Sequence, residues 1–246
     1  MIINSYRFAG WENTYCMVSD GVDEYIDLGR VTDTEGAANY SVSFWMWMSS
    51  DSPTNYIMGR FNGANNSFYI TKANLTNGNG IGVTIGDGSS YGVVRMDNAI
   101  TFSQWIHVVV VYDGSLSGGT NRVKIYVDDT LEARTESLTI PTTINSDTTS
   151  MALFALGGST SNNVQCRLDE VRFYDYALTS GNVSSIYNSG TPIEDDLSTL
   201  ATHKYRMGDD DTWGGTNWTL NDTGTTGGNN GTSANMEEAD RLTSVV

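Results

Sequence analysis

Proline, cysteine, lysine and histidine are scarce in this chain of 246 residues. It has 13 basic against 29 acidic residues, a formal net charge of −16, and no cluster of Lys or Arg. Nucleic acid is therefore not an expected partner, because phosphate binding needs clustered basic residues. The same charge argues against adhesion to an anionic membrane, and the lack of a run of about 18 apolar residues excludes a membrane-spanning helix.

Turn-forming residues are abundant instead. The chain has 26 Gly but 3 Pro, with many Ser, Thr, Asn and Asp residues, which is typical of short strands joined by tight turns. A chain of this length can bury a large core, and β-sandwiches of this size form single domains. The composition therefore predicts an all-β protein.

The most informative stretch is 168–179, with the sequence LDEVRFYDYALT. Its apolar and polar residues alternate from Glu170 to Phe173, as a half-buried strand requires. The apolar residues of 177–187 then fall three to five positions apart, which predicts one short helix near 177–189 that Gly190 and Pro192 end.

Three further stretches predict strands. Residues 40–48 read as a central strand, and residues 105–114 as a buried strand that ends in a turn. After a loop rich in Gly and Ser, residues 122–129 alternate cleanly and are expected to pair with 105–114 as a hairpin.

Together these segments resemble the concanavalin A-like, laminin G-like superfamily of jelly-roll domains. The family has, in order, an opening Asp-Gly strand, a strand with a buried Trp, a Trp-x-His strand, a Tyr-Val-Asp-Gly-type hairpin and a closing Leu-Asp-Glu-Val-Arg strand. The matching residues here are 20–26, Phe44-Trp45, 105–107, 125–129 and the stretch from Leu168. The resemblance covers about residues 1–192 and implies a β-sandwich of two antiparallel sheets over residues 1–194. Asp129 stands where the family usually has Gly, but Asp tolerates positive φ better than most residues.

The C-terminal part, residues 195–246, is rich in Asp, Asn, Thr and Gly, and such a segment does not bury a core of its own. We expect an extended arm that lies over its own domain or over a neighbouring subunit. Its expected anchors are Tyr205, Trp213, Trp218 and Met236. This tail resembles those that follow laminin G-like domains in structural proteins of marine bacteriophages.

The start of the chain, residues 1–8, lacks a basic segment followed by a long apolar one, so no signal peptide is predicted. Laminin G-like domains act mostly outside cells. Release by lysis as part of a virus particle is the simplest route, although a processed chain would begin in the same way.

Carbohydrate binding is the non-catalytic function that this fold most often implies, and it needs exposed aromatic faces beside polar groups. Residues in loop-rich regions that could form such a patch are Tyr56, Phe61, Asn62, Asn65, Asn66, Tyr69 and Tyr91. The alternative is that these aromatic residues are core residues or cross-strand pairs.

One structural Ca²⁺ is the cofactor that the resemblance implies, because members of the superfamily often hold calcium between the opening and closing strands. Here that points to Asp20, Asp23 and Asp169. The alternative is that these carboxylates cap turns through bonds to the backbone.

Catalysis is not expected. Glucanases of this fold place two carboxylates two positions apart on one strand, and no such pair flanked by aromatic residues occurs. His107 and His203 are the only histidines, and the family fills the position of His107 with a packed structural side chain. Cys16 and Cys166 are expected to lie near each other as buried free thiols, since the opening and closing strands are neighbours in the family.

The sequence therefore predicts a non-enzymatic structural protein of a bacteriophage particle, either capsid decoration or part of a tail or fibre. Its expected partners are other virion proteins, copies of itself in a homo-oligomer, and host-surface glycans. The first alternative is a carbohydrate-binding adhesion module of a cellular protein, and the second is a β-glucanase-like hydrolase.

Overall fold

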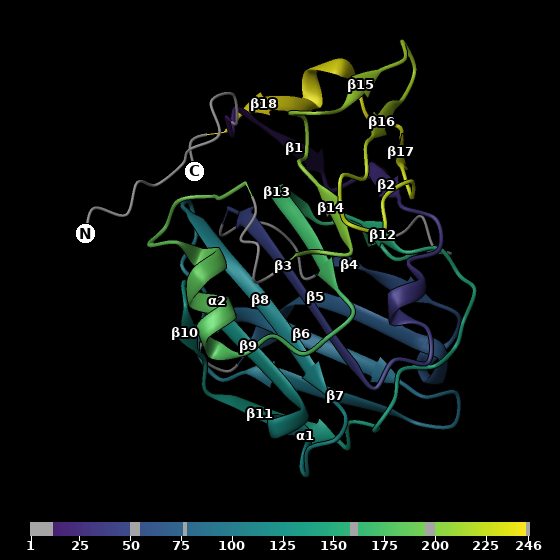
Figure 1. Cartoon of the computed structure of the whole chain (residues 1–246), viewed down its shortest axis with the longest axis vertical. Helices are drawn as coiled ribbons and strands as arrows, with labels where there is room; N and C mark the ends of the chain where they lie inside the picture. The colour runs from purple at the N-terminus through teal and green to yellow at the C-terminus, as the bar shows by residue number, and fades with distance from the viewer. Residues whose placement is uncertain (1–11, 50–54, 76–77, 158–161, 195–199, 245–246) are drawn as a thin grey trace.

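The computed structural model describes residues 12–49, 55–75, 78–157, 162–194 and 200–244. Two antiparallel sheets of eight and ten strands stack face to face, and the helices of the described residues are short (Figure 1). This confirms the predicted all-β sandwich of the jelly-roll type.

The eight-stranded sheet, sheet A, has the order β10-β9-β8-β3-β13-β1-β18, and β14 also pairs with β13. Its strands are β1 (Tyr15–Asp20), β3 (Asn39–Trp47), β8 (Trp105–Asp113), β9 (Val123–Val127), β10 (Thr130–Leu131), β13 (Gln165–Tyr174), β14 (His203–Tyr205) and β18 (Arg241–Thr243). The four stretches from which strands were predicted all lie in this sheet.

The ten-stranded sheet, sheet B, has the order β11-β7-β6-β5-β4-β12-β2-β17-β16-β15. Its strands are β2 (Tyr25–Asp27), β4 (Tyr56–Phe61), β5 (Ser67–Leu75), β6 (Gly78–Gly86), β7 (Tyr91–Met96), β11 (Arg134–Leu138), β12 (Ala152–Leu153), β15 (Thr212–Trp213), β16 (Trp218–Leu220) and β17 (Gly231–Ala234). The helices are η1 (Thr32–Thr34), η2 (Ala64–Asn66), α1 (Gly119–Arg122), α2 (Ser180–Tyr187) and η3 (Glu238–Asp240).

The core lies between the two sheets and follows the period of two along each strand. In β3, Val42, Phe44 and Met46 are fully buried in the main apolar cluster, and Phe68 and Ile70 of β5 join it from sheet B. Successive side chains of a strand point to opposite faces, so the residues between these face away from the core.

The short helix α2 covers the outer face of sheet A, where Figure 1 shows it in front of β8 and β9. Val183 and Ile186 pack there against Val109 and Val111. Thr179 begins the helix with a capping box, since its hydroxyl accepts from the backbone N–H of Asn182 and its own N–H donates to that side chain. Asn188, in the left-handed conformation with φ 47°, ends it before Gly190.

The hairpin predicted from residues 105–129 is confirmed by the pairing of β8 with β9. Asp128 and Asp129, with φ 48° and 66°, turn the chain from β9 into β10. Asp at the family's glycine position therefore takes the positive φ that the turn requires.

The cysteines lie on adjacent strands of sheet A. Cys166 of β13 pairs with Ser19 of β1, and Cys16 lies three positions away on β1. Both thiols are buried and form no disulfide, and burial raises the pKa of Cys16 to about 12.

The C-terminal segment pairs with both sheets of its own chain. Its strands β14 and β18 extend sheet A, whereas β15, β16 and β17 continue sheet B beyond β2 (Figure 1). Of the four expected anchors, Tyr205, Trp218 and Met236 are buried in the main core and Trp213 packs against it. Contact of this segment with a neighbouring subunit stays a prediction.

A buried charged cluster ties this segment to the first half of the chain. Nδ1 of His203 lies 2.6 Å from Oδ2 of Asp222, and its Nε2 lies 3.7 Å from Oδ2 of Asp33 in η1. Burial lowers the pKa of His203, but the hydrogen bond and charge of Asp222, with the charge of Asp33, outweigh it and raise the pKa above 6.5.

Trp218 offers a test of how far the core depends on the C-terminal segment. Its side chain is 1% exposed and its Nε1 donates to the carbonyl of Glu237 at 2.9 Å. We expect Trp218→Ala to lower the free energy of unfolding by about 3–5 kcal/mol, the usual cost of removing a buried aromatic side chain. Urea denaturation measures this, and Val22→Ala, at a residue 70% exposed, is the control. A loss below about 1 kcal/mol would mean that the segment adds little to the core.

The histidine cluster predicts a pH dependence. Because the pKa of His203 is higher in the folded than in the unfolded chain, its stabilising contribution is complete below about pH 6.5 and is lost as the pH rises through the folded pKa. The difference in unfolding free energy between wild type and His203→Gln should therefore be largest near pH 6 and shrink towards pH 8. Urea denaturation across this range measures it, and a constant difference would contradict the assignment of charge to His203.

Candidate functional site

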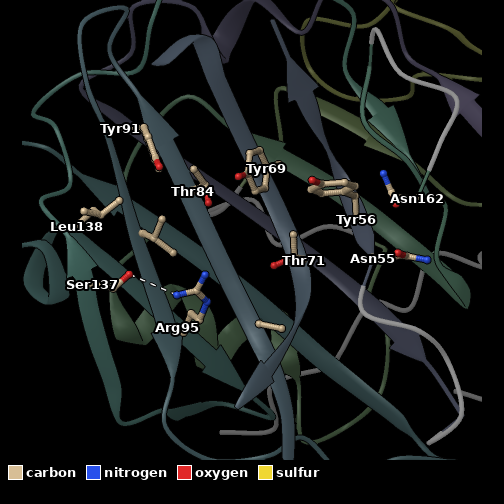
Figure 2. A pocket seen from close by; sticks show the side chains of 12 residues that line it. Asn55, Tyr56, Tyr69, Thr71, Thr84, Tyr91, Arg95, Ser137, Leu138 and Asn162 are labelled. Carbon is tan, nitrogen blue, oxygen red and sulfur yellow. Dashed lines mark hydrogen bonds between the residues drawn. The ribbon is translucent and has the colours of Figure 1, made fainter. Parts of the chain in front are cut away.

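The outer face of sheet B carries a hollow with a volume of about 630 Å³. It crosses β4, β5, β6, β7 and β11, and Figure 2 shows the side chains that line it. The lining residues are Asn55, Tyr56, Tyr69, Thr71, Ala73, Thr84, Tyr91, Val93, Arg95, Ser137, Leu138 and Asn162.

Strand alternation brings these residues to one face. On β5, Phe68 and Ile70 enter the core, so Tyr69 and Thr71 face outwards. On β7, Val94 and Met96 are core residues, whereas Tyr91, Val93 and Arg95 point to the opposite face and line the hollow. The core and the hollow are therefore the two faces of the same strands.

The register of the ladders arranges the lining in two rows across the strands. One row runs Leu138, Val93, Thr84 and Tyr69, and the other runs Arg95, Gly82, Thr71 and Tyr56. From β4 to β11 there are four steps between strands, so the hollow extends over roughly 19 Å.

Glycines keep parts of this face low. A Cβ on Gly82 would lie 2.9 Å from Oγ1 of Thr71 and 3.5 Å from Cγ of Arg95, so the positions of these two side chains over the sheet require glycine between them. A Cβ on Gly59 would lie 2.3 Å from Cβ of Tyr69, and its absence lets the two strands approach there.

Aromatic rings form one end of the hollow. Tyr56 and Tyr69 pack edge to face with ring centroids 5.2 Å apart, and Phe61 lies 6.4 Å from Tyr69 on its other side. Burial, and then the neighbouring Tyr69, raise the pKa of Tyr56 above 10, so its hydroxyl stays protonated at neutral pH.

Arg95 provides the charge at the other end. Its Nη1 donates to Oγ of Ser137 at 3.3 Å, and the side chain is exposed (Figure 2). Ser137 falls in a β-bulge of β11, between Glu136 and Leu138, which pair with Val94 and Val93. The bulge adds a residue to the edge strand, and that residue faces the hollow.

Residues 20–184 match the sequence pattern of the concanavalin A-like lectin/glucanases superfamily, in its laminin G-like group. This chain belongs to that superfamily. The resemblance noted from the motifs between Asp20 and Thr179 is thereby confirmed. Among proteins with curated functions, no sequence matches this laminin G-like chain.

Solved structures share the fold. A protein from Bacteroides ovatus ATCC 8483, to which carbohydrate binding has been ascribed, is 16% identical with a TM-score of 0.64, over 95% of this chain and 60% of that one. The Ruminococcus gnavus IT-sialidase CBM40, solved with α2,3 sialyllactose, is 12% identical with a TM-score of 0.52, over 72% of this chain and 99% of that one. NanB sialidase from Streptococcus pneumoniae is 14% identical with a TM-score of 0.54, over 85% of this chain and 36% of that one. This laminin G-like chain thus spans 60% of the length of the Bacteroides ovatus protein.

The predicted carbohydrate residues divide into two groups. Tyr56, Tyr69 and Tyr91 line the hollow, and Phe61 contacts it through Tyr69. The asparagines lie outside the lining and their amides bond within the chain: Asn62 donates to Asp147, Asn65 donates to Ser89, and Asn66 accepts from Asn145.

Sequence reasoning missed Arg95, Thr84 and Ser137. The alternation of 91–96 could have placed Arg95 on the same face as Tyr91, because both stand at odd positions of one strand. Ser137 carried no such signal, since only the bulge of β11 turns it towards Arg95.

The carboxylates predicted to hold calcium do not converge in the described part of the laminin G-like domain. Asp20 pairs with Gln165, four positions from Asp169 along the ladder, which separates their backbones by about 13 Å. Oδ1 of Asp20 accepts from the backbone N–H of Val22, as a turn cap does, and Oδ2 of Asp169 accepts from Asn13 and Ser244. No group of three or more His, Cys, Asp or Glu suited to a metal ion occurs in the described ranges, and calcium binding stays a prediction.

Other chemistry-bearing residues have packing partners. His107 is 3% exposed; its ring is tilted against Trp45 at a centroid distance of 4.9 Å and stacks with Tyr187 at 5.9 Å. Burial, with a smaller effect of Arg172, lowers the pKa of His107 to about 3. Glu170 on β13 is buried and pairs with Arg172 at 2.8 Å and with Arg206 at 3.2 Å.

Within the described ranges, no helix has the length and apolar character to cross a membrane.

Proposed function

We propose that this domain binds an oligosaccharide in the hollow on sheet B and performs no chemistry on it. The observation that carries the proposal is the convergence of Tyr56, Tyr69 and Tyr91 with polar side chains in one hollow. Tyrosine rings offer apolar faces on which sugar rings stack, and their hydroxyls remain available for hydrogen bonds.

The size and lining of the hollow support this ligand class. Its volume of about 630 Å³ lies within the range of about 300–1,000 Å³ that small-ligand sites occupy. Thr71 and Thr84 supply hydroxyl groups that match sugar hydroxyls, and Asn55, whose Nδ2 donates to the carbonyl of Asn163, supplies an amide oxygen. The protein from Bacteroides ovatus and the Ruminococcus gnavus CBM40 domain, which share the fold, lend further support.

Binding without hydrolysis is proposed because the described lining contains no Asp or Glu. A retaining glycosidase needs two carboxylates about 5–5.5 Å apart and an inverting one needs them about 6.5–9.5 Å apart. Incubation of the protein with β-glucans would test the glucanase alternative, and release of reducing ends would contradict this part of the proposal.

Tyr69 is the residue on which the binding proposal is best tested. We expect Tyr69→Ala to weaken oligosaccharide binding about fivefold to tenfold, because the stacking face at the centre of the aromatic end is lost. Tyr69→Phe keeps the ring and should bind nearly as wild type. Glycan-array screening followed by calorimetry with a bound oligosaccharide measures the change.

Tyr25→Ala serves as the matched control, since Tyr25 is a half-buried tyrosine of β2 outside the hollow. Equal affinities of Tyr69→Ala and wild type, with both folded by circular dichroism, would place the ligand elsewhere. An array without any bound glycan would remove the proposed function altogether.

We also propose, from the sequence resemblance of the C-terminal segment, that the domain is a structural component of a bacteriophage particle and forms a homo-oligomer there. Host-surface glycans would then be its ligands, and calcium a structural ion. Copurification with intact particles and an oligomeric mass by light scattering support this placement. A soluble monomer absent from particles favours the adhesion module of a cellular protein instead.

A further inference from the structure

From the charge of its lining we infer that the hollow selects an acidic oligosaccharide, whose anionic group binds Arg95 while neighbouring sugar rings lie towards Tyr69 and Tyr56. This inference rests on the proposed function and adds the class of ligand and its direction. The anionic group is a carboxylate or a sulfate ester, which share the geometry that a guanidinium recognises.

Arg95 is the one charged residue of the described lining. No carboxylate of the described residues lies within ion-pair distance of it, and its side chain donates to Ser137 over 3.3 Å.

Of the other described arginines, six have closer hydrogen-bond or ion-pair partners and two lie over aromatic rings. Carboxylates pair with Arg30, Arg172 and Arg206, backbone carbonyls accept from Arg60, Arg122 and Arg134, and aromatic rings stack on Arg167 and Arg241. Most N–H donors of the Arg95 guanidinium are therefore available to a ligand. Five N–H donors in a planar fork match the two oxygens of a carboxylate or two of a sulfate.

The sheet is low between Arg95 and the aromatic end. Gly82 lies between Arg95 and Thr71 in the same row and carries no side chain that rises above its neighbours. Tyr56 ends this row and Tyr69 ends the adjacent one. A ligand that places its anion on Arg95 and extends across β6 therefore reaches the aromatic end.

The net charge of −16 gives this arrangement a selective effect. Around most of the surface an anionic saccharide is repelled, and Arg95 offers a local attraction inside the hollow. Without Arg95, the acidic form of a ligand should bind no better than its neutral form.

The test uses ligands that differ only in charge. Tetragalacturonate and its fully methyl-esterified form differ by their carboxylates, and a sulfated galactan tetrasaccharide and its desulfated form differ by their sulfates. Wild type should bind the acidic member of one pair about tenfold more tightly, as a charged hydrogen-bonded pair allows. Which pair shows the preference identifies the anion.

Arg95→Gln should abolish this preference, so that the acidic and neutral members bind with equal affinity. Arg95→Lys keeps the charge without the fork and should retain only part of the preference. Arg30→Gln removes the same charge from an exposed arginine outside the hollow and should keep the full preference. Raising the salt from about 0.05 to 0.5 M should weaken only the acidic member, because screening shortens the reach of the attraction.

Equal binding of the acidic and neutral members by wild type, or a preference that survives in Arg95→Gln, would overturn the inference and leave oligosaccharide binding standing. Failure of every member of both pairs to bind, with the protein folded by circular dichroism, would count against both.

Discussion

The pleat of sheet B is the constraint on which the core and the proposed site both depend. Each strand of β5, β6 and β7 gives alternate side chains to the space between the sheets and to the outer face. A shift of one residue in register would move Phe68 out of the core and Tyr69 into it. The apolar packing that stabilises the sandwich therefore also fixes which tyrosines and which arginine face the hollow.

The strands of sheet A could be predicted because their local patterns are strong. Residues 105–113 form a nearly continuous apolar run, and 170–173 alternate before a capped helix, so the local pattern predicts strands where the fold has them. The half-buried strand predicted from that alternation was wrong in its burial, because Glu170 and Arg172 are buried as well. The C-terminal segment carried little such information. Its strands are two to four residues long and polar on one side, and they exist because sheet edges of the same chain offer them hydrogen-bond partners.

The site could be predicted only in part for a related reason. Aromatic residues stand out in a sequence, and three of the tyrosines chosen for that reason line the hollow. The asparagines near them hold loops together, which composition cannot distinguish from ligand binding. Arg95 and Ser137 meet through the pairing of β7 with β11, strands that are separated in sequence by β8, β9 and β10. Long-range register of this kind is decided by packing and has no local signature.

The pairing of β1 with β18 has a consequence for how the molecule forms. β18 is the last strand of the described chain, and it lies beside the first, with Tyr15 opposite Thr243. During synthesis, this edge of sheet A cannot close until β18 has left the ribosome. Pairings between strands far apart in sequence form slowly, because loop entropy is lost before the contacts form. A nascent chain of this kind exposes an unpaired strand edge for longer than its compact final form suggests.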